Sequence, residues 1–284
     1  MDQGLPKDAP PPYSRYPDEE PGTPTTSQHQ SAPHGAQSAS QPQPQQAQPL
    51  TNFPALPPTP RQFPPAWNLY RVGALRGTMM LGEDASRPLY AVSQHSGWSG
   101  QPDMILHNGP SETLPPLATG ERDMRWASGS HTLIHLPSFP GSNRAGGTDE
   151  RLETLLSWPH ISYTFTVEVG SPGSYRREIF EWRHSSGVAV ASLGGVRTGW
   201  KLIRLATDAP PGVESGWQFV AGGDTSSDGK EIVAVWAQAA MSMSKVLKFR
   251  FIGSGVTGVL GERWAVMAVM TALRMHQHAE RDRR

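Results

Sequence analysis

A strongly apolar segment near the C-terminus is the sequence feature that most constrains how this chain can fold. Residues Glu262 to Arg274 read as a helix, and from Trp264 to Leu273 every residue except Thr271 is apolar. A surface helix carries a single apolar stripe, so a helix that is apolar on all sides has to be enclosed by other elements. It is also shorter than the roughly 20 apolar residues that a bilayer-spanning helix needs. The large side chains predicted to form its structural core are Trp264, Met267, Met270 and Leu273.

Composition divides the chain into two parts. Residues 1–66 hold 17 of the 28 prolines and none of the nine tryptophans, and 28–48 is a low-complexity mixture of Gln, Pro, Ser and Ala. Such a segment buries too little apolar surface to offset the entropy cost of ordering, so 1–66 is predicted to be a disordered Pro/Gln-rich region. Residues 67–280 are long enough for one domain with a substantial core, and 281–284 form a charged tail.

Charge and cysteine content exclude several classes of function. The chain has 25 acidic and 25 basic residues and no cysteine. Disulfides and cysteine-based metal or redox sites are therefore excluded, and the balanced charge argues against a nucleic-acid partner, which requires a basic excess. The N-terminus lacks the features of a signal peptide, and no apolar window reaches transmembrane length. We expect an intracellular protein, cytoplasmic or peripheral to a membrane, that is neither secreted nor transmembrane.

The domain has the hydrophobic period of β-strands. Between Ile161 and Val169, apolar residues alternate with Ser, Thr and Glu, which is typical of a half-buried antiparallel strand. The predicted strands are 67–71, 89–93, 104–107, 131–136, 161–169, 178–183, 188–193, 200–205, 217–220, 232–236 and 245–252. A longer Gly/Pro/Ser-rich loop is predicted at 137–149 and a short helix near 149–156. Many short strands separated by turn residues, followed by an enclosed helix, predict a mainly β barrel built around that helix.

Several segments occur in an order that indicates a known family. They are WNLYR at 67–71, LY at 89–90, PDMILHNG at 102–109, FEWR at 180–183, GWKL at 199–202 and GERW at 261–264. Together they resemble the tubby C-terminal-like domains of fungal proteins, which are related to tubby proteins, plant LURP-one-related proteins and phospholipid scramblases. The resemblance covers about 67–280 and implies a closed barrel of roughly twelve strands threaded by a central apolar helix.

Two motifs suggest ligand sites, but each has a simpler interpretation. The glycines of 253–258 match G-x-G-x-x-G, yet the chain ends after the following helix and supplies no second strand, so a tight turn is favoured over a nucleotide site. His131 and His135 would lie about 13 Å apart on a strand, too far to share a metal, and His276 and His278 are expected in a frayed polar tail. We predict no cofactor, no metal site and no catalytic residues.

Basic residues on the strands form the candidate lipid contact. Tubby proteins bind phosphoinositide headgroups through basic barrel residues, so the resemblance implies that this barrel contacts a phosphoinositide membrane surface. The candidate residues are Arg176, Arg177, Lys201, Arg204, Lys248 and Arg250. Lys248 and Arg250 are expected to point outward from the last strand. The alternative is an ordinary solvated strand face that discourages aggregation.

The N-terminal region carries one short partner motif. Pro10, Pro11, Pro12 and Tyr13 match P-P-x-Y, the ligand of WW domains. A polyproline II segment is already extended, so it loses little entropy when it docks on an aromatic groove. Chance occurrence in a proline-rich segment is the alternative.

The sequence as a whole predicts a non-enzymatic binding or adaptor module. In this hypothesis the barrel contacts phosphoinositides or a protein, and the N-terminal region recruits a WW-domain partner. A phospholipid scramblase-like membrane protein is the alternative, although the chain lacks the cysteines and the acidic calcium-binding loop of scramblases. An unknown enzyme is the third hypothesis.

Overall fold

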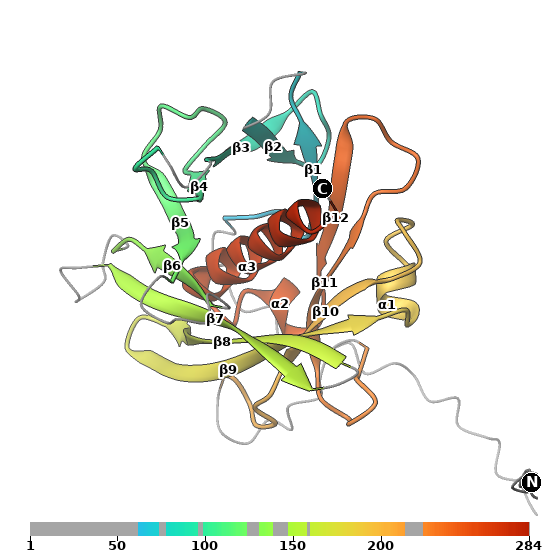
Figure 1. The fold of residues 1–284 in the computed structure, drawn as a ribbon. Helices are drawn as coiled ribbons and strands as arrows, with labels where there is room; N and C mark the ends of the chain where they lie inside the picture. Colours follow the sequence, from blue (N-terminus) through green and yellow to red (C-terminus); the bar gives the residue numbers. More distant parts are fainter. Residues whose placement is uncertain are drawn as a thin grey trace, which may run out of the picture. The chain divides into compact units, whose positions relative to one another are not determined.

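Twelve antiparallel strands close into a barrel around the C-terminal helix in the computed structural model of the chain (Figure 1). The structure describes residues 62–73, 78–95, 99–123, 131–138, 147–157, 160–213 and 224–283. The partner motif and nearly all of the N-terminal region predicted to be disordered lie outside these residues. The prediction of a mainly β barrel with an enclosed C-terminal helix is confirmed.

The barrel is an up-and-down meander in which each strand pairs with the next one in the sequence. The strands are β1 (Ala66–Arg71), β2 (Thr78–Gly82), β3 (Pro88–Gln94), β4 (Met104–His107), β5 (Pro116–Arg122), β6 (Thr132–Leu136), β7 (Thr148–Ser157), β8 (His160–Ser171), β9 (Ser174–Ser185), β10 (Gly199–Arg204), β11 (Ile232–Gln238) and β12 (Lys245–Phe251). The barrel closes where β1 pairs with β12, with Trp67 opposite Phe249 and their rings stacked 4.6 Å apart. Closure leaves neither terminal strand with an unpaired edge along this seam.

Helix α3 (Glu262–Arg281) runs through the middle of the ring of strands (Figure 1). Trp264, Met267, Met270 and Leu273 are all at most 1% exposed, which confirms their predicted core role. The one polar interruption is satisfied, because Thr271 Oγ1 accepts a hydrogen bond of 2.9 Å from the Trp182 indole. Burial of a large apolar side chain contributes about 1.5–3 kcal/mol, so this helix is a principal source of barrel stability.

The C-terminal end of α3 differs from the prediction of a frayed tail. The helix continues to Arg281, and Arg274, His276 and Gln277 are all at most 3% exposed. Arg274 lies 3.3 Å from the carboxylate of Asp103, which supplies the opposite charge that a buried guanidinium requires. The barrel therefore also encloses polar residues that follow the apolar run of the helix.

Two predicted elements have the wrong secondary structure. Residues 149–156 were predicted as a helix but belong to β7, where Glu150 and Leu152 are buried and alternate with exposed residues. Residues 188–193 were predicted as a strand but contain α1 (Val188–Ala191), which packs Val190 and Leu193 against Val235 on the outside of β11. In both cases tertiary packing overrides local propensity.

The remaining strand predictions differ in outcome. Strands β2 and β5 have no counterpart among the predicted ones, whereas the predicted strand 217–220 lies outside the described residues. The other predicted strands correspond to observed strands with shifted ends. The loop predicted at 137–149 ends earlier, because β7 already begins at Thr148.

Candidate functional site

Lys248 and Arg250 project from the outer face of β12, as predicted, because the residues that alternate with them are buried. The Lys248 ammonium donates hydrogen bonds of 2.8 and 2.9 Å to the carbonyl oxygens of Leu193 and Gly194. The Arg250 guanidinium donates to the hydroxyl and the carbonyl oxygen of Ser192 at 3.2 and 3.3 Å. Carbonyls at the end of a helix lack intrahelical partners, so both cations hold the end of α1 against the barrel wall.

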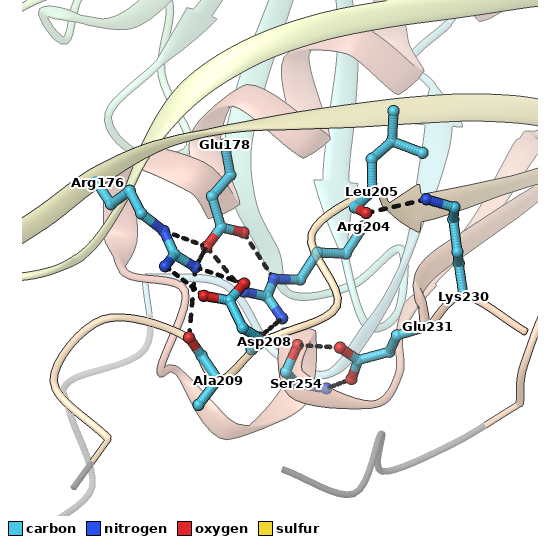
Figure 2. A network of polar contacts seen from close by, with 9 residues as sticks. All are labelled: Arg176, Glu178, Arg204, Leu205, Asp208, Ala209, Lys230, Glu231 and Ser254. Atoms are coloured by element: carbon cyan, nitrogen blue, oxygen red, sulfur yellow. Dashed lines mark hydrogen bonds and ion pairs between the residues drawn. The ribbon is translucent and has the colours of Figure 1, made fainter. Parts of the chain in front are cut away.

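Arg204 and Arg176 belong to one network of hydrogen-bonded charged residues (Figure 2). Arg204 is fully buried and donates two hydrogen bonds, of 2.6 and 2.8 Å, to the buried carboxylate of Glu178. Arg176 is 40% exposed and bonds both Glu178 and Asp208. Two guanidinium groups thus share one buried carboxylate, and Arg204 is enclosed by protein instead of being presented at the surface.

The charge state of this network follows from its hydrogen bonds. The bonds to Glu178 and then to Asp208 raise the pKa of Arg176, and the bond from Arg176 lowers the pKa of Asp208. Arg204 also donates a hydrogen bond of 2.6 Å to the carbonyl oxygen of Asp208. The network therefore ties β9 and β10 to the segment that follows β10, which is a structural role.

The glycine motif at 253–258 forms a turn and a one-turn helix, α2 (Ser254–Thr257), instead of a phosphate-binding loop. Gly253 and Gly258 have φ values of 55° and 86°, which favour glycine. The amide and hydroxyl of Ser254 donate hydrogen bonds of 2.7 and 3.0 Å to the carboxylate of Glu231 (Figure 2). Burial raises the pKa of Glu231. Because a protein carboxylate already occupies this helix start, the predicted interpretation as a tight turn that leads into α3 is confirmed.

Arg177 spans a place where the barrel wall separates. β7 and β8 pair next to the hairpin that joins them, and their last paired residues are Leu152 and Phe165. Thr166 and the residues after it therefore have no partner on β7. Arg177 reaches the gap, donating to the carbonyl of Thr166 at 3.4 Å and pairing with both carboxylate oxygens of buried Glu150 at 2.7 and 2.8 Å. The ion pair lines a groove of about 500 Å³.

The six candidate lipid-contact residues do not form one cluster. Arg176, Arg177 and Arg204 lie towards the end of the barrel where α3 begins. Lys201 is half-buried on β10, opposite Val235 of β11, which in turn lies opposite Arg250. Lys201 and Arg250 are therefore two strands, or about 10 Å, apart on one outer face. Five of the six side chains are held by protein hydrogen bonds.

His107 and His135 also contact other groups of the protein. His135 Nδ1 lies 2.8 Å from Asp149, and no group of three or more His, Cys, Asp or Glu side chains that could hold a metal occurs among the residues that the structure describes. Buried Ser93 and His107 are 2.8 Å apart, and the other ring nitrogen of His107 lies 3.0 Å from the carbonyl oxygen of Leu114. This pair joins β3 and β4 to the loop that follows β4, which is a packing role.

A different surface stands out at the end of the barrel where α3 ends. Because the strands alternate in direction, the connections that follow β1, β3, β5, β7, β9 and β11 all lie at this end. Arg71, the last residue of β1, pairs with Glu280 of α3 at 3.2 Å, and Arg281 donates to the carbonyl oxygen of His95, which follows β3, at 3.3 Å. We call this end the C-terminal rim.

Exposed apolar side chains are concentrated on the C-terminal rim. They are Val72, Leu155, Leu156, Ile161, Val188, Val196, Met241 and Met243. The four most exposed large apolar side chains of the described residues are among them: Met241 at 103%, Met243 at 100%, Val188 at 80% and Leu156 at 76%. Leu89, Leu114, Tyr175 and Ile179 are the exposed large apolar residues described elsewhere, and none exceeds 55%. Apolar residues in several neighbouring connections of one end are typical of a contact surface.

The hairpin between β11 and β12 has an unusual residue at its tip. Met241 has a φ of 50°, and it is the described non-glycine residue with a positive φ. Turns that need this conformation use Gly, Asn or Asp, so a methionine there carries a backbone strain of about 1–2 kcal/mol. Residues held in sparsely populated backbone conformations are concentrated at functional sites.

Cationic side chains accompany the apolar ones on the rim. Among the residues that the structure describes, the bases are Arg71, Arg122, Arg197, Lys245, Arg281 and Arg283, and the exposed or half-buried acids at this level are Glu112, Glu121, Glu280 and Asp282. Lys245 also lies 5.6 Å from the centre of the Tyr70 ring. The described part of the rim therefore carries more basic than acidic side chains, in a chain whose acidic and basic residues are equal in number.

No protein-family model, no curated protein and no solved structure matches this chain. The fold defines the class directly, as a closed twelve-stranded antiparallel barrel around a buried C-terminal helix. The resemblance to tubby C-terminal-like domains stays a prediction from the residues. Within the described part of the chain, no helix has both the length and the apolar character that crossing a bilayer requires.

Proposed function

We propose that this protein is a non-enzymatic binding module that attaches to anionic membrane surfaces through the C-terminal rim. The observation that carries the proposal is the concentration of exposed apolar side chains in four neighbouring connections of one barrel end. The N-terminal motif Pro10–Tyr13 adds a second function, the recruitment of a WW-domain partner, so that the chain acts as an adaptor.

The exposed apolar side chains of the rim can contribute several kcal/mol to the free energy of membrane binding. Complete removal of a methionine or leucine side chain from water is worth about 1.5–3 kcal/mol. Met241, Met243 and Leu156 are at least three-quarters exposed, so each has most of this free energy still to gain. Loop tips of this kind enter the boundary between headgroups and acyl chains, as amphipathic segments do.

The basic side chains supply the preference for anionic lipids. A lysine or arginine near an anionic leaflet contributes about 1 kcal/mol, and this attraction decays within a Debye length. Arg122, Arg197 and Arg283 are exposed on the rim and can approach lipid phosphates. A membrane therefore matches both properties of the rim, whereas a purely apolar partner surface matches only one.

Co-sedimentation of the full chain with vesicles tests the proposal. Vesicles of phosphatidylcholine alone are compared with vesicles that also contain phosphatidylserine or a phosphoinositide, at low and moderate salt. The double variant Met241→Ser/Met243→Ser is expected to lower the affinity at least about tenfold. The matched control is Tyr175→Ser/Ile179→Ser, which removes exposed apolar side chains at other places and is expected to bind as the wild type does.

Three outcomes lead to other conclusions. Absence of binding to every vesicle refutes the membrane proposal and makes the rim a protein-contact surface. Equal losses in the rim variant and in the control show that general stickiness caused the binding. Flip-flop of a labelled lipid in vesicles that contain the protein supports the scramblase alternative.

The partner motif has its own test. Capture of the full chain by an immobilised WW domain is expected, and Tyr13→Ala is expected to abolish it, because the tyrosine and prolines dock together on the aromatic groove. Replacing Tyr16, which is not preceded by three prolines, is the control. Capture that survives Tyr13→Ala removes this part of the proposal without affecting the barrel.

A further inference from the structure

The two methionines at the tip of the β11–β12 hairpin differ from the other described methionines in exposure. Met241 and Met243 are completely exposed. The others that the structure describes are packed inside the barrel or its wall. Met79, Met104, Met267, Met270 and Met275 are at most 7% exposed, and Met80 is half-buried. Among the methionines that the structure describes, an oxidant dissolved in water therefore reaches these two thioethers first.

The chemistry of these thioethers is simple. The sulfur attacks one oxygen of a peroxide, the O–O bond breaks, an S–O bond forms, and the remaining oxygen leaves as water or an alcohol. The sulfur is oxidised by two electrons and the peroxide is reduced by two electrons. The product, methionine sulfoxide, is polar, and methionine sulfoxide reductases convert it back to methionine.

The hairpin holds its shape without help from the two side chains. The Ala239 amide donates to the Val246 carbonyl at 3.1 Å, and the Lys245 amide donates to the Ser242 hydroxyl at 2.9 Å. The Arg71 amide donates to the Ser244 carbonyl at 2.8 Å, which fixes the hairpin to β1. Because these bonds involve backbone and serine groups, oxidation of the sulfurs changes the polarity of the tip and leaves the barrel folded.

We propose that Met241 and Met243 are a reversible oxidation site for peroxides, and that their oxidation releases the C-terminal rim from membranes. The inference rests on the proposed membrane attachment. A sulfoxide has a strong dipole that is solvated by water, so moving the oxidised side chains into the lipid boundary is no longer favourable.

The experiment treats the full chain with dilute hydrogen peroxide and maps the added oxygen by peptide mass spectrometry. The peptide that contains both residues is expected to gain an oxygen on each sulfur before the buried methionines react. Sedimentation with anionic vesicles is then expected to show at least about a tenfold loss of affinity, restored by methionine sulfoxide reductase. Circular dichroism confirms that the oxidised protein stays folded.

A matched variant separates this site from other effects of peroxide. Met241→Leu/Met243→Leu keeps the apolar tips without sulfur, so it is expected to bind vesicles before and after peroxide treatment. Oxidation of Met79 or Met104 ahead of the tip residues overturns the inference, and so does unchanged binding of the oxidised wild type. Failure of the untreated wild type to bind any vesicle is a separate result, which overturns the proposed function and the release together.

Discussion

Replacing Arg204 by methionine removes one partner of a fully buried ion pair. Arg204 is 0% exposed and Glu178 is 2% exposed, and the guanidinium donates to both carboxylate oxygens at 2.6 and 2.8 Å. Loss of one partner of such a pair costs about 3–5 kcal/mol, because a charge stays buried without full compensation. Arg176 still contacts Glu178 at 2.5 Å, so we expect the lower part of this range.

Urea unfolding followed by tryptophan fluorescence measures this cost. With a denaturant dependence of about 3 kcal/mol per molar urea, a loss of about 3 kcal/mol lowers the unfolding midpoint by about 1 M. The matched control is Arg176→Met, which removes a guanidinium that is 40% exposed and is expected to cost about 1 kcal/mol or less. Glu178→Leu/Arg204→Met, which removes both charges, is expected to be more stable than Arg204→Met alone.

Comparison of Arg204→Met with Arg176→Met tests whether burial determines how much each contact stabilises the barrel. If Arg204→Met and Arg176→Met lower the midpoint equally, burial does not determine the value of these contacts. If the double variant is the least stable of the three, the ion pair stabilises the barrel by more than its desolvation cost, which contradicts the expected order of stability.

Three further substitutions test the region around α3. Burial lowers the pKa of His276 to about 4, so stability that is present above about pH 6.5 is lost as the pH falls towards 4. His276→Phe is therefore expected to make the protein less sensitive to acid. Urea unfolding midpoints of both proteins across this pH range measure the difference. Met267→Lys places an unpaired charge at a fully buried position, and a soluble variant with the circular dichroism of the wild type would contradict the enclosed-helix interpretation. Gly261 has a φ of 85°, and a Cβ added there would lie 2.3 Å from the Gly170 carbonyl oxygen, so Gly261→Ala is expected to cost more than about 3 kcal/mol of stability. The control Gly173→Ala has a similar φ of 89° but places its Cβ in open space, so it is expected to cost about 1–2 kcal/mol. Equal thermal midpoints of the two variants would contradict the close approach at Gly261.

The sequence was sufficient to predict the fold class, because two local patterns carried it. Alternation between 161 and 169 fixes one face of a strand, and an apolar run on all sides of a helix has to be enclosed wherever the helix lies. Both signals depend on the residues themselves and on their spacing. The predicted core of α3 was confirmed for the same reason.

Local patterns failed where packing outweighs propensity. Residues 149–156 are rich in Glu and Leu, which favour helices, yet β7 forms because both neighbouring strands offer hydrogen-bond partners and Leu152 faces the core. Residues 188–193 are rich in Val and Ala, yet they form α1 because Val190 and Leu193 can then cover the outer face of β11. Propensities of a few tenths of a kcal/mol per residue do not outweigh such burial.

The candidate site depended on tertiary structure more than the fold did. Six basic residues were chosen from the sequence, and only the register of the strands reveals that Arg204 is buried, that Lys248 and Arg250 hold α1, and that the six do not converge. The rim was not predicted from the sequence, although Met-Ser-Met at 241–243, between two predicted strands, indicated an exposed apolar turn. Two of its residues that contact each other, Arg71 and Glu280, are 209 positions apart in the chain.

The sequence by itself determined that a barrel forms around a helix, since alternation and all-round apolarity are local and have few physical solutions. Tertiary structure alone decided which charges are buried in pairs and which apolar residues gather at one end. Closure of twelve alternating strands brings distant connections together, and whether a side chain is buried or exposed depends on neighbours that are remote in sequence.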